Sequence, residues 1–226
     1  MDGWFVIITI DGPAGAGKSS AAKGLAARIH FEYLDTGAMF RAVALALHRL
    51  GIDPETTPHL ASVLETLRLD QPVDRTLLNG EDVSEAIRTP LISNLASQVA
   101  VIACVRDYLA RRQREVAAGR NMVCEGRDQG TVVFPDAFLK IFLTADPLER
   151  ARRRHRELIA RGQNIPLEEV FRMQQERDAR DMSRQLAPAR PAADAVLLDT
   201  THLSLADVLD RLELELHRRR RLVDAE

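Results

Sequence analysis

Apolar and polar positions follow one another in blocks along the chain, and the blocks predict strands that alternate with helices. Short runs of apolar and β-branched residues predict five strands, at 4–10, 32–35, 121–125, 138–144 and 195–199. Apolar residues at helical spacing predict helices over 18–30, 38–50, 91–118, 146–161 and 166–183. Strands and helices in alternation are joined by right-handed crossovers, so we expect an α/β fold with a parallel five-stranded sheet flanked by helices.

The segment 51–89 breaks this alternation. It contains three prolines and a short helical pattern at about 59–67. Further along, Asn79-Gly80 stands between short apolar flanks, and this dipeptide is the strongest local signal for a tight hairpin. We therefore expect a small subdomain over 51–89, inserted into a single domain.

The rest of the chain divides around a second irregular stretch, at 162–166 between two arginine-rich helices. Irregular segments beside a site are candidates for mobile lids, so we expect a lid region over 151–170. The core of the domain would then comprise 1–50, 90–150 and 185–226. An apolar stripe after Ser204 predicts a C-terminal helix, with that stripe facing either the core or a second copy of the chain.

Residues 12–19 read G-P-A-G-A-G-K-S and fit the pattern G-x-x-x-x-G-K-[ST] between a predicted strand and a predicted helix. Glycines let backbone N–H groups turn inward around an anion, and the helix N-terminus adds its positive dipole end. Lys18 can reach the β- and γ-phosphates, and the Ser19 hydroxyl can ligate Mg²⁺. This pattern predicts a nucleoside-triphosphate site; the residues expected to bind ATP are Gly12, Pro13, Ala14, Gly15, Ala16, Gly17, Lys18, Ser19 and Ser20.

Composition excludes several classes of protein. The 226 residues are 46% hydrophobic and 28% charged, which fits one folded domain and not a disordered chain. A formal charge of −2 argues against a general nucleic-acid coat protein. Two cysteines are too few for a disulfide framework. The seven-residue apolar run at 4–10 has an acid, Asp2, before it in place of a basic flank and no small-residue cleavage pattern after it, so it does not read as a signal peptide. No apolar stretch approaches 18 residues, so we expect a cytoplasmic protein without a membrane span.

All but three of the 31 basic residues are arginine, and they form two clusters. One cluster occupies the helix predicted at 146–161, where Arg150 and Arg154 share a face. In the second, Arg177, Asp181 and Arg184 fall on one helical face at spacings of four and three. The first cluster fits either a solvated helix surface or a phosphate site. The second fits either a salt-bridge network or a polar ligand pocket.

Four further motifs accompany the phosphate loop. They read D-T-G-A-M-F-R over 35–41, N-G-E-D-V-S over 79–84, A-S-Q-V-A over 96–100 and E-G-R-D-Q-G-T-V-V-F-P-D-A over 125–137. With these motifs the chain resembles the bacterial cytidylate kinases, essentially from end to end. The resemblance implies an adenylate-kinase-like fold with a lid and an enlarged monophosphate-binding subdomain. It also implies transfer of the γ-phosphoryl group of ATP to CMP or dCMP, with Mg²⁺ as cofactor.

The resemblance also assigns roles to residues of this chain. The implied catalytic residues are Lys18, Arg127, Arg150 and Arg154. The implied CMP-binding residues are Thr36, Arg41, Ser97, Arg106, Arg127, Asp128, Arg177, Asp181 and Arg184. Among the latter, Arg41 and Arg127 would hold the acceptor phosphate, and Asp128, Arg106 and Arg184 would contact the pyrimidine ring. The pentose would be contacted by Ser97, Arg177 and Asp181.

The chain departs from the family pattern at a few positions, and other functions stay open. It has Thr36 where serine is more usual, Phe40 for tyrosine, Glu125 for aspartate, Gln129 for methionine and Ala103 for proline.

The nearest alternative function is the same chemistry on UMP, AMP or shikimate. A nucleotide-dependent switch or a nucleic-acid-dependent ATPase would also use a phosphate loop. We expect a monomer whose partners are ATP and CMP or dCMP, with no nucleic acid and no membrane.

Overall fold

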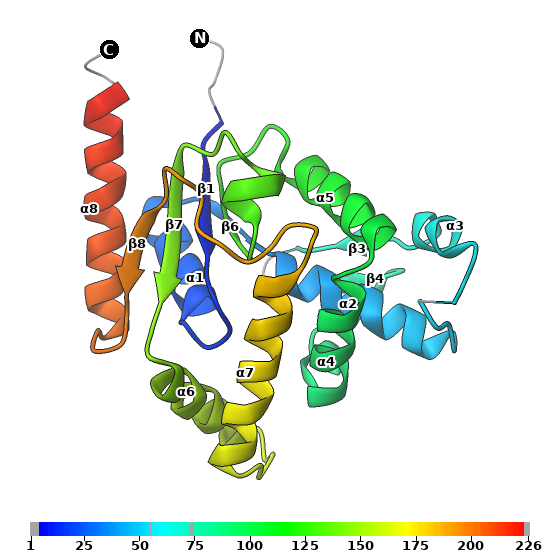
Figure 1. Ribbon diagram of the computed structural model, residues 1–226. Helices are drawn as coiled ribbons and strands as arrows, with labels where there is room; N and C mark the ends of the chain where they lie inside the picture. Colours follow the sequence, from blue (N-terminus) through cyan, green and yellow to red (C-terminus); the bar gives the residue numbers. More distant parts are fainter. Residues whose placement is uncertain (1–4, 55, 73–74, 224–226) are drawn as a thin grey trace.

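The computed structural model describes residues 5–54, 56–72 and 75–223, and its centre is a five-stranded parallel sheet (Figure 1). The strand order is β2 (Glu32–Asp35), β6 (Met122–Glu125), β1 (Ile7–Asp11), β7 (Leu139–Thr144) and β8 (Val196–Asp199). All five strands agree with the sequence prediction to within a few residues. The start of the first predicted strand, at 4, lies outside the described residues.

Successive residues of a strand point to opposite faces of the sheet, so the apolar strands present apolar side chains on both faces. A layer of helices covers each face. On one face, α1 (Lys18–Ile29) and α8 (Leu205–Val223) pack against β1 and β7. On the other face, α2 (Thr36–Arg49) and α5 (Ala103–Ala117) enclose the second half of the core. The stripe that the sequence placed on the C-terminal helix faces the core over most of its length: Val208, Leu209, Leu212 and Leu216 are buried, and α8 packs against α1. Its first residue, Leu205, is 49% exposed and does not take part.

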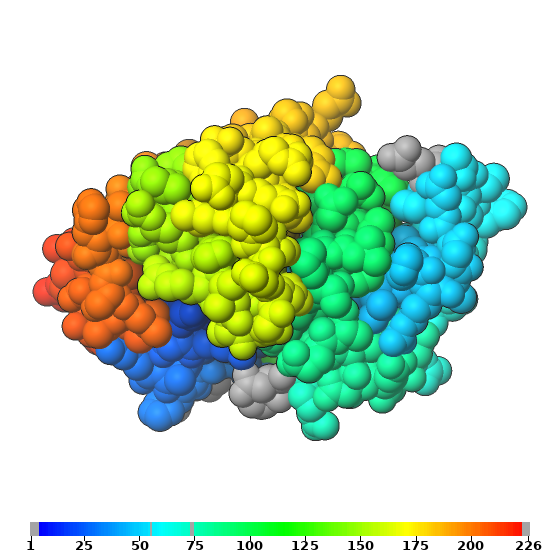
Figure 2. Space-filling view, turned by 90° about the horizontal axis from the view of Figure 1, so that it is seen from below, coloured from blue at the N-terminus to red at the C-terminus, as the bar shows by residue number. Residues whose placement is uncertain are grey.

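Two more helices, α6 (Pro147–Ala160) and α7 (Leu167–Ser183), lie beyond the carboxyl ends of the strands (Figure 1). Figure 2 shows these two helices, in yellow-green and yellow, across the middle of that face of the molecule. On either side of them lie the orange-red β8–α8 region and the cyan inserted segment. Ligands of open parallel sheets bind at this edge, so α6 and α7 are placed to border a site.

The prediction of one helix over 91–118 is wrong. The structure has α4 (Pro90–Val99) and then α5, separated at 100–102, where Ile102 is extended with φ −86° and ψ 122°. The spacing of apolar residues did not reveal the break, because apolar residues continue through 100–102 without interruption. The buried Arg106 side chain donates from Nη1 to Ala100 O at 3.0 Å, which satisfies a carbonyl that the break releases. The break turns α4 and α5 so that both border one cleft.

The inserted segment contains α3 (Leu60–Glu65), a 3₁₀ turn (Ala86–Arg88) and a small antiparallel sheet. The strands of this sheet are β3 (Leu69–Asp70), β4 (Leu77–Leu78) and β5 (Glu81–Asp82). Asn79 and Gly80 adopt φ of 52° and 85°, as a two-residue hairpin requires, so the predicted hairpin is confirmed. Apolar side chains of the segment join the cluster that includes α2 and α5.

Candidate active site

The phosphate loop joins β1 to α1 at the carboxyl edge of the sheet, in the strand–loop–helix context that its motif requires. Gly12 has φ 144°, and a Cβ there would lie 2.1 Å from Leu143 O, so only glycine fits against β7. Lys18 Nζ curls back over the loop and donates to Pro13 O at 2.8 Å. Burial and the Arg127 cation lower the pKa of Lys18, because a second charge is held close by in a poorly solvated place.

A cleft of about 810 Å³ opens beside this loop and runs between α4 and α7. Most of the site residues predicted from the sequence line it: Ala14, Gly15, Gly17, Lys18, Ser19, Ser20, Thr36, Arg41, Ser97, Arg106, Arg127, Asp128, Arg154, Arg177, Asp181 and Arg184. The predicted residues that do not line it are Gly12, Pro13, Ala16 and Arg150. The three loop residues among these shape the phosphate loop from within.

Arg150, which the resemblance implied to be a catalytic residue, does not line the cleft. Its guanidinium is buried, donates to Ala14 O at 2.9 Å and Ala145 O at 3.1 Å, and forms an ion pair with Asp178. Asp178 Oδ1 also accepts from Ala14 N at 3.3 Å. The pair therefore holds the phosphate loop from outside. Arg154, one helical turn further along α6, lines the cleft instead.

In the part of the cleft that α7 borders, one carboxylate lies close to three guanidinium groups. Asp181 Oδ2 accepts from Arg127 Nε at 3.1 Å, while Arg177 and Arg184 lie 3.9 and 3.6 Å from the same carboxylate. Burial opposes ionisation of Asp181, but the three cations outweigh it and lower the pKa of this carboxyl. Burial and Arg127 lower the pKa of Arg177 to about 10. Such concentrated positive charge suits a phosphorylated ligand.

Unpartnered polar atoms also mark this part of the cleft. Among the described residues, Ser97 Oγ and Arg177 Nε are buried without a hydrogen-bond partner. Both residues line the cleft. Buried polar groups are nearly always paired in folded proteins, so these two atoms indicate where a polar ligand makes its contacts.

A second ion pair closes the inner end of the cleft. Asp128 is buried, and its carboxylate accepts from Arg106, whose guanidinium carbon also lies 5.6 Å from the centre of the Phe40 ring. These contacts fix the Arg106 plane between a carboxylate and an aromatic face. The result is a narrow polar end with both a hydrogen-bond acceptor and hydrogen-bond donors.

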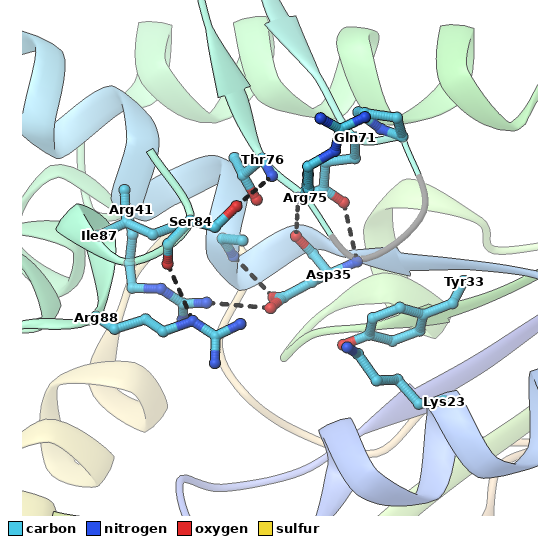
Figure 3. Close-up of a pocket in the computed structure, with 12 residues that line it drawn as sticks. Lys23, Tyr33, Asp35, Arg41, Gln71, Arg75, Thr76, Ser84, Ile87 and Arg88 are labelled. Carbon is cyan, nitrogen blue, oxygen red and sulfur yellow. Dashed lines mark hydrogen bonds and ion pairs between the residues drawn. The ribbon is translucent and has the colours of Figure 1, made fainter. Parts of the chain in front are cut away.

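A smaller pocket of about 40 Å³ adjoins the cleft at the inserted segment (Figure 3). Figure 3 shows Asp35 at its centre, where Oδ1 caps α2 through Ala38 N at 2.7 Å and Oδ2 accepts from Arg41 at 3.1 Å. Gln71 pairs with the Asp35 backbone in both directions, at 3.1 and 2.7 Å. Gln71 therefore ties the inserted segment to the turn that presents Arg41.

Near the start of α1, Tyr33 Oη donates to the Glu125 carboxylate, and Ser19 lies beside that carboxylate. Burial and the Asp35 charge raise the pKa of Glu125. A hydroxyl and a carboxylate thus meet at the start of α1, beside Lys18. These are the oxygen donors that magnesium sites use.

Comparison with known proteins decides the family. The family model described as cytidylate kinase matches residues 8–218. The chain belongs to the cytidylate kinase family. It is 48% identical over 220 residues to the cytidylate kinase of Geobacter sulfurreducens, covering 96% of this chain and 94% of that one. It is 48% identical over 209 residues to the cytidylate kinase of Carboxydothermus hydrogenoformans, covering 91% and 94%.

As a member of the cytidylate kinase family, the chain is an enzyme, a phosphotransferase that acts on cytidylate. Among solved structures, an uncharacterised protein from Eubacterium ventriosum is similar with a TM-score of 0.51 and 12% identity, covering 94% of this chain and 98% of that one. That likeness concerns the fold alone. No helix in the described part of the chain is both long and apolar enough to cross a membrane.

Sequence reasoning missed several residues at this cytidylate kinase site. Asp178 stood inside a motif noted for its neighbours, and its spacing of four from Gln174 on α7 could have drawn attention to it. For Gln71 no local signal existed, since its partner Asp35 lies 36 residues away. The contact between Tyr33 and Glu125 joins two strands and was equally invisible in the sequence.

Proposed function

We propose that this chain transfers the γ-phosphoryl group of magnesium-bound ATP to CMP or dCMP, with ATP on the phosphate loop and the acceptor between α4 and α7. One observation carries the proposal: a single cleft joins Lys18 to the cationic cluster around Asp181 and to the buried pair of Arg106 and Asp128. A donor phosphate, an acceptor phosphate and a polar base can thus be held together in one place.

The chemistry asks mainly for positioning and charge neutralisation. Arg41 and Arg127 would hold the acceptor phosphate, one oxygen of which forms the new bond to the γ-phosphorus. The bond from that phosphorus to the bridging oxygen breaks, and ADP leaves with the electron pair. Lys18 and Arg154 both line the cleft and would neutralise the charge on the group in transit.

Magnesium fits the oxygen atoms present at the start of α1. The Ser19 hydroxyl and the Glu125 carboxylate meet there, and magnesium in kinases takes one or two such ligands together with substrate phosphates and water. When bound, the ion would withdraw charge from the β- and γ-phosphates. Tyr33, through its hydrogen bond to Glu125, would keep that carboxylate turned toward Ser19.

Two segments would complete the site. We assign 51–89 as the monophosphate-binding subdomain and 151–170 as the lid. Arg88 of the first segment borders the cleft, and Arg154, Arg161 and Ile165 of the second line it from the α6–α7 side. The lid would exclude water, which would otherwise compete for the γ-phosphoryl group.

The base would be read by the pair at the inner end of the cleft. Cytosine offers an N4 amine that donates, and N3 and O2 that accept, whereas uracil presents O4 and N3–H instead. An ionised carboxylate only accepts and a guanidinium only donates. Asp128 opposite N4, with Arg106 and Arg184 toward N3 and O2, would therefore match cytosine and leave uracil with mismatched groups.

Replacement of Asp128 by asparagine should reduce this preference. Each unsatisfied buried group costs about 1–3 kcal/mol, so two mismatches allow a preference for CMP over UMP of roughly a hundredfold. Asp128→Asn adds a donor opposite O4 of uracil and should raise the relative use of UMP, measured as the ratio of kcat/KM for CMP and UMP. Equal losses on both substrates would instead assign Asp128 to the phosphate end.

A panel of acceptors tests the proposal as a whole. ADP release would be measured with CMP, dCMP, UMP, AMP or shikimate, with no acceptor, and with DNA or RNA. We expect CMP and dCMP to support the fastest turnover. Turnover that ignores the acceptor would indicate a nucleotide switch, and stimulation by nucleic acid would indicate a nucleic-acid-dependent ATPase.

A further inference from the structure

Asp11 is a buried carboxylate at the junction of the two nucleotide sites. It is the last residue of β1, and Gly12 of the phosphate loop follows it directly. Its side chain does not face the cleft. Instead, Oδ1 accepts from Gln129 N at 2.9 Å and Oδ2 accepts from Gly130 N at 2.8 Å.

The two N–H groups belong to the first residues of η2 (Gln129–Val133), a π-helical turn that begins directly after Asp128. The first N–H groups of a helical turn have no partner within the turn and need one from elsewhere. Asp11 is that partner, reaching across from the neighbouring strand. Single π-helical turns are frequent at functional sites.

The segment between β6 and η2 is thereby held at both of its ends by β1. At its start, Gly126 N donates to Ile10 O at 3.1 Å, which extends the pairing of β1 with β6. At its end stand the two hydrogen bonds to Asp11. Arg127 and Asp128 lie between these anchors. Their backbone is therefore positioned by the same end of β1 that leads into the phosphate loop.

The surroundings of Asp11 both oppose and support its negative charge. Burial raises the pKa of Asp11 to about 6, with Asp128 adding to the effect, whereas the two N–H groups and Lys18 oppose it. The Cys124 thiol of β6 also lies within the field of this carboxylate. Elsewhere on β1, Thr9 Oγ1 is buried without a hydrogen-bond partner and would lie 2.9 Å from a Cβ at Gly130.

We propose that Asp11 is a positioning residue, which holds Arg127 and Asp128 in register with the phosphate loop so that acceptor and donor phosphates align. The inference rests on the proposed function in that it takes Arg127 and Asp128 as contacts of CMP. Asp11 itself touches neither nucleotide.

The test compares Asp11→Asn with the control Thr9→Val, in which a buried side chain beside the same turn changes but no hydrogen bond is lost. The amide of Asp11→Asn places an N–H₂ against one of the two backbone donors. Small misplacements of positioning groups cost on the order of 10- to 100-fold, so we expect KM for CMP to rise by roughly that factor. KM for ATP should stay within about threefold, and Thr9→Val should keep both constants.

A pH series supplies a readout that a merely structural role would not move. Protonation below about pH 6 turns one Asp11 oxygen into a donor, so the advantage of the wild type over Asp11→Asn in kcat/KM for CMP should shrink as the pH falls through 6. Ionisation of the CMP phosphate affects the wild type and the variant equally, so its effect cancels in the ratio of their kcat/KM values.

Three outcomes would overturn the inference: an equal rise in KM for CMP and ATP, a pH-independent ratio, or unchanged constants. Should Asp11→Asn fail to fold, hydrogen exchange of the wild type decides. Protection of 126–133, corrected for intrinsic rates, should fall between pH 7 and 5 more than that of 121–125, and equal behaviour would contradict the proposal. A wild type without activity on CMP would refute the proposed function instead.

Discussion

Replacement of Lys18 by alanine is expected to lower kcat by about three decades or more, the scale of other transition-state charge contacts. Lys18 lies in the cleft at the start of α1, and its amine folds back on Pro13 O at 2.8 Å. Only a long, flexible cation there can follow charge from the β-phosphate onto the migrating group. Steady-state ADP release at saturating ATP and CMP measures the loss.

The same substitution should leave the fold intact. Burial and Arg127 lower the pKa of Lys18, so its charged form is disfavoured in the folded chain. For a cation with a lowered pKa, this cost is present below the lowered pKa and disappears as the pH rises toward the unfolded value. Lys18→Met keeps the aliphatic volume and should hold its thermal midpoint at pH 7 while losing the same activity. A folded variant with near-normal turnover would contradict the assignment.

Asp178→Ala is expected to lower the free energy of unfolding by roughly 3–5 kcal/mol. The substitution leaves the Arg150 guanidinium buried without its carboxylate, in a place where its side chain is 10% exposed. Breaking a buried pair from one side costs far more than the pair itself contributes, because the remaining charge has lost its compensation. Chemical denaturation measures the change, provided that the unfolding free energy depends on denaturant concentration with the same slope in the variant and the wild type.

The control lies on the same helix. Arg172 pairs with Glu176 at 2.8 Å in an exposed position of α7, so Arg172→Ala should cost about 1 kcal/mol or less. Asp178→Ala should also raise KM for ATP more than KM for CMP, since Ala14 of the phosphate loop loses the carboxylate that accepts from its N–H. Equal stability of the two variants would show that Arg150 finds another partner.

Several features were readable from the sequence because their causes are local. The five strands follow from short apolar runs, and the phosphate loop follows from glycines at fixed spacing before a helix. Asn79-Gly80 specifies its hairpin through two residues that tolerate positive φ. The motif at 125–137 pointed to the family, which the comparisons then showed. The proposed division into core, insertion and lid, the monomeric state and the cytoplasmic location stay predictions.

Other features depend on contacts between segments that are distant in the sequence, and only the tertiary structure decided them. The break between α4 and α5 is stabilised by Arg106 reaching back to Ala100, and no helical period records it. Arg150 carries the same charge as Arg154, but Asp178 and Ala14 engage it because α7 packs on α6 beside the phosphate loop. Asp11 finds Gln129 and Gly130 across 118 and 119 residues because β1 and β6 are neighbours in a parallel sheet. Local propensity determines which elements form, whereas the partner of a buried charge is determined by which elements the sheet order places side by side.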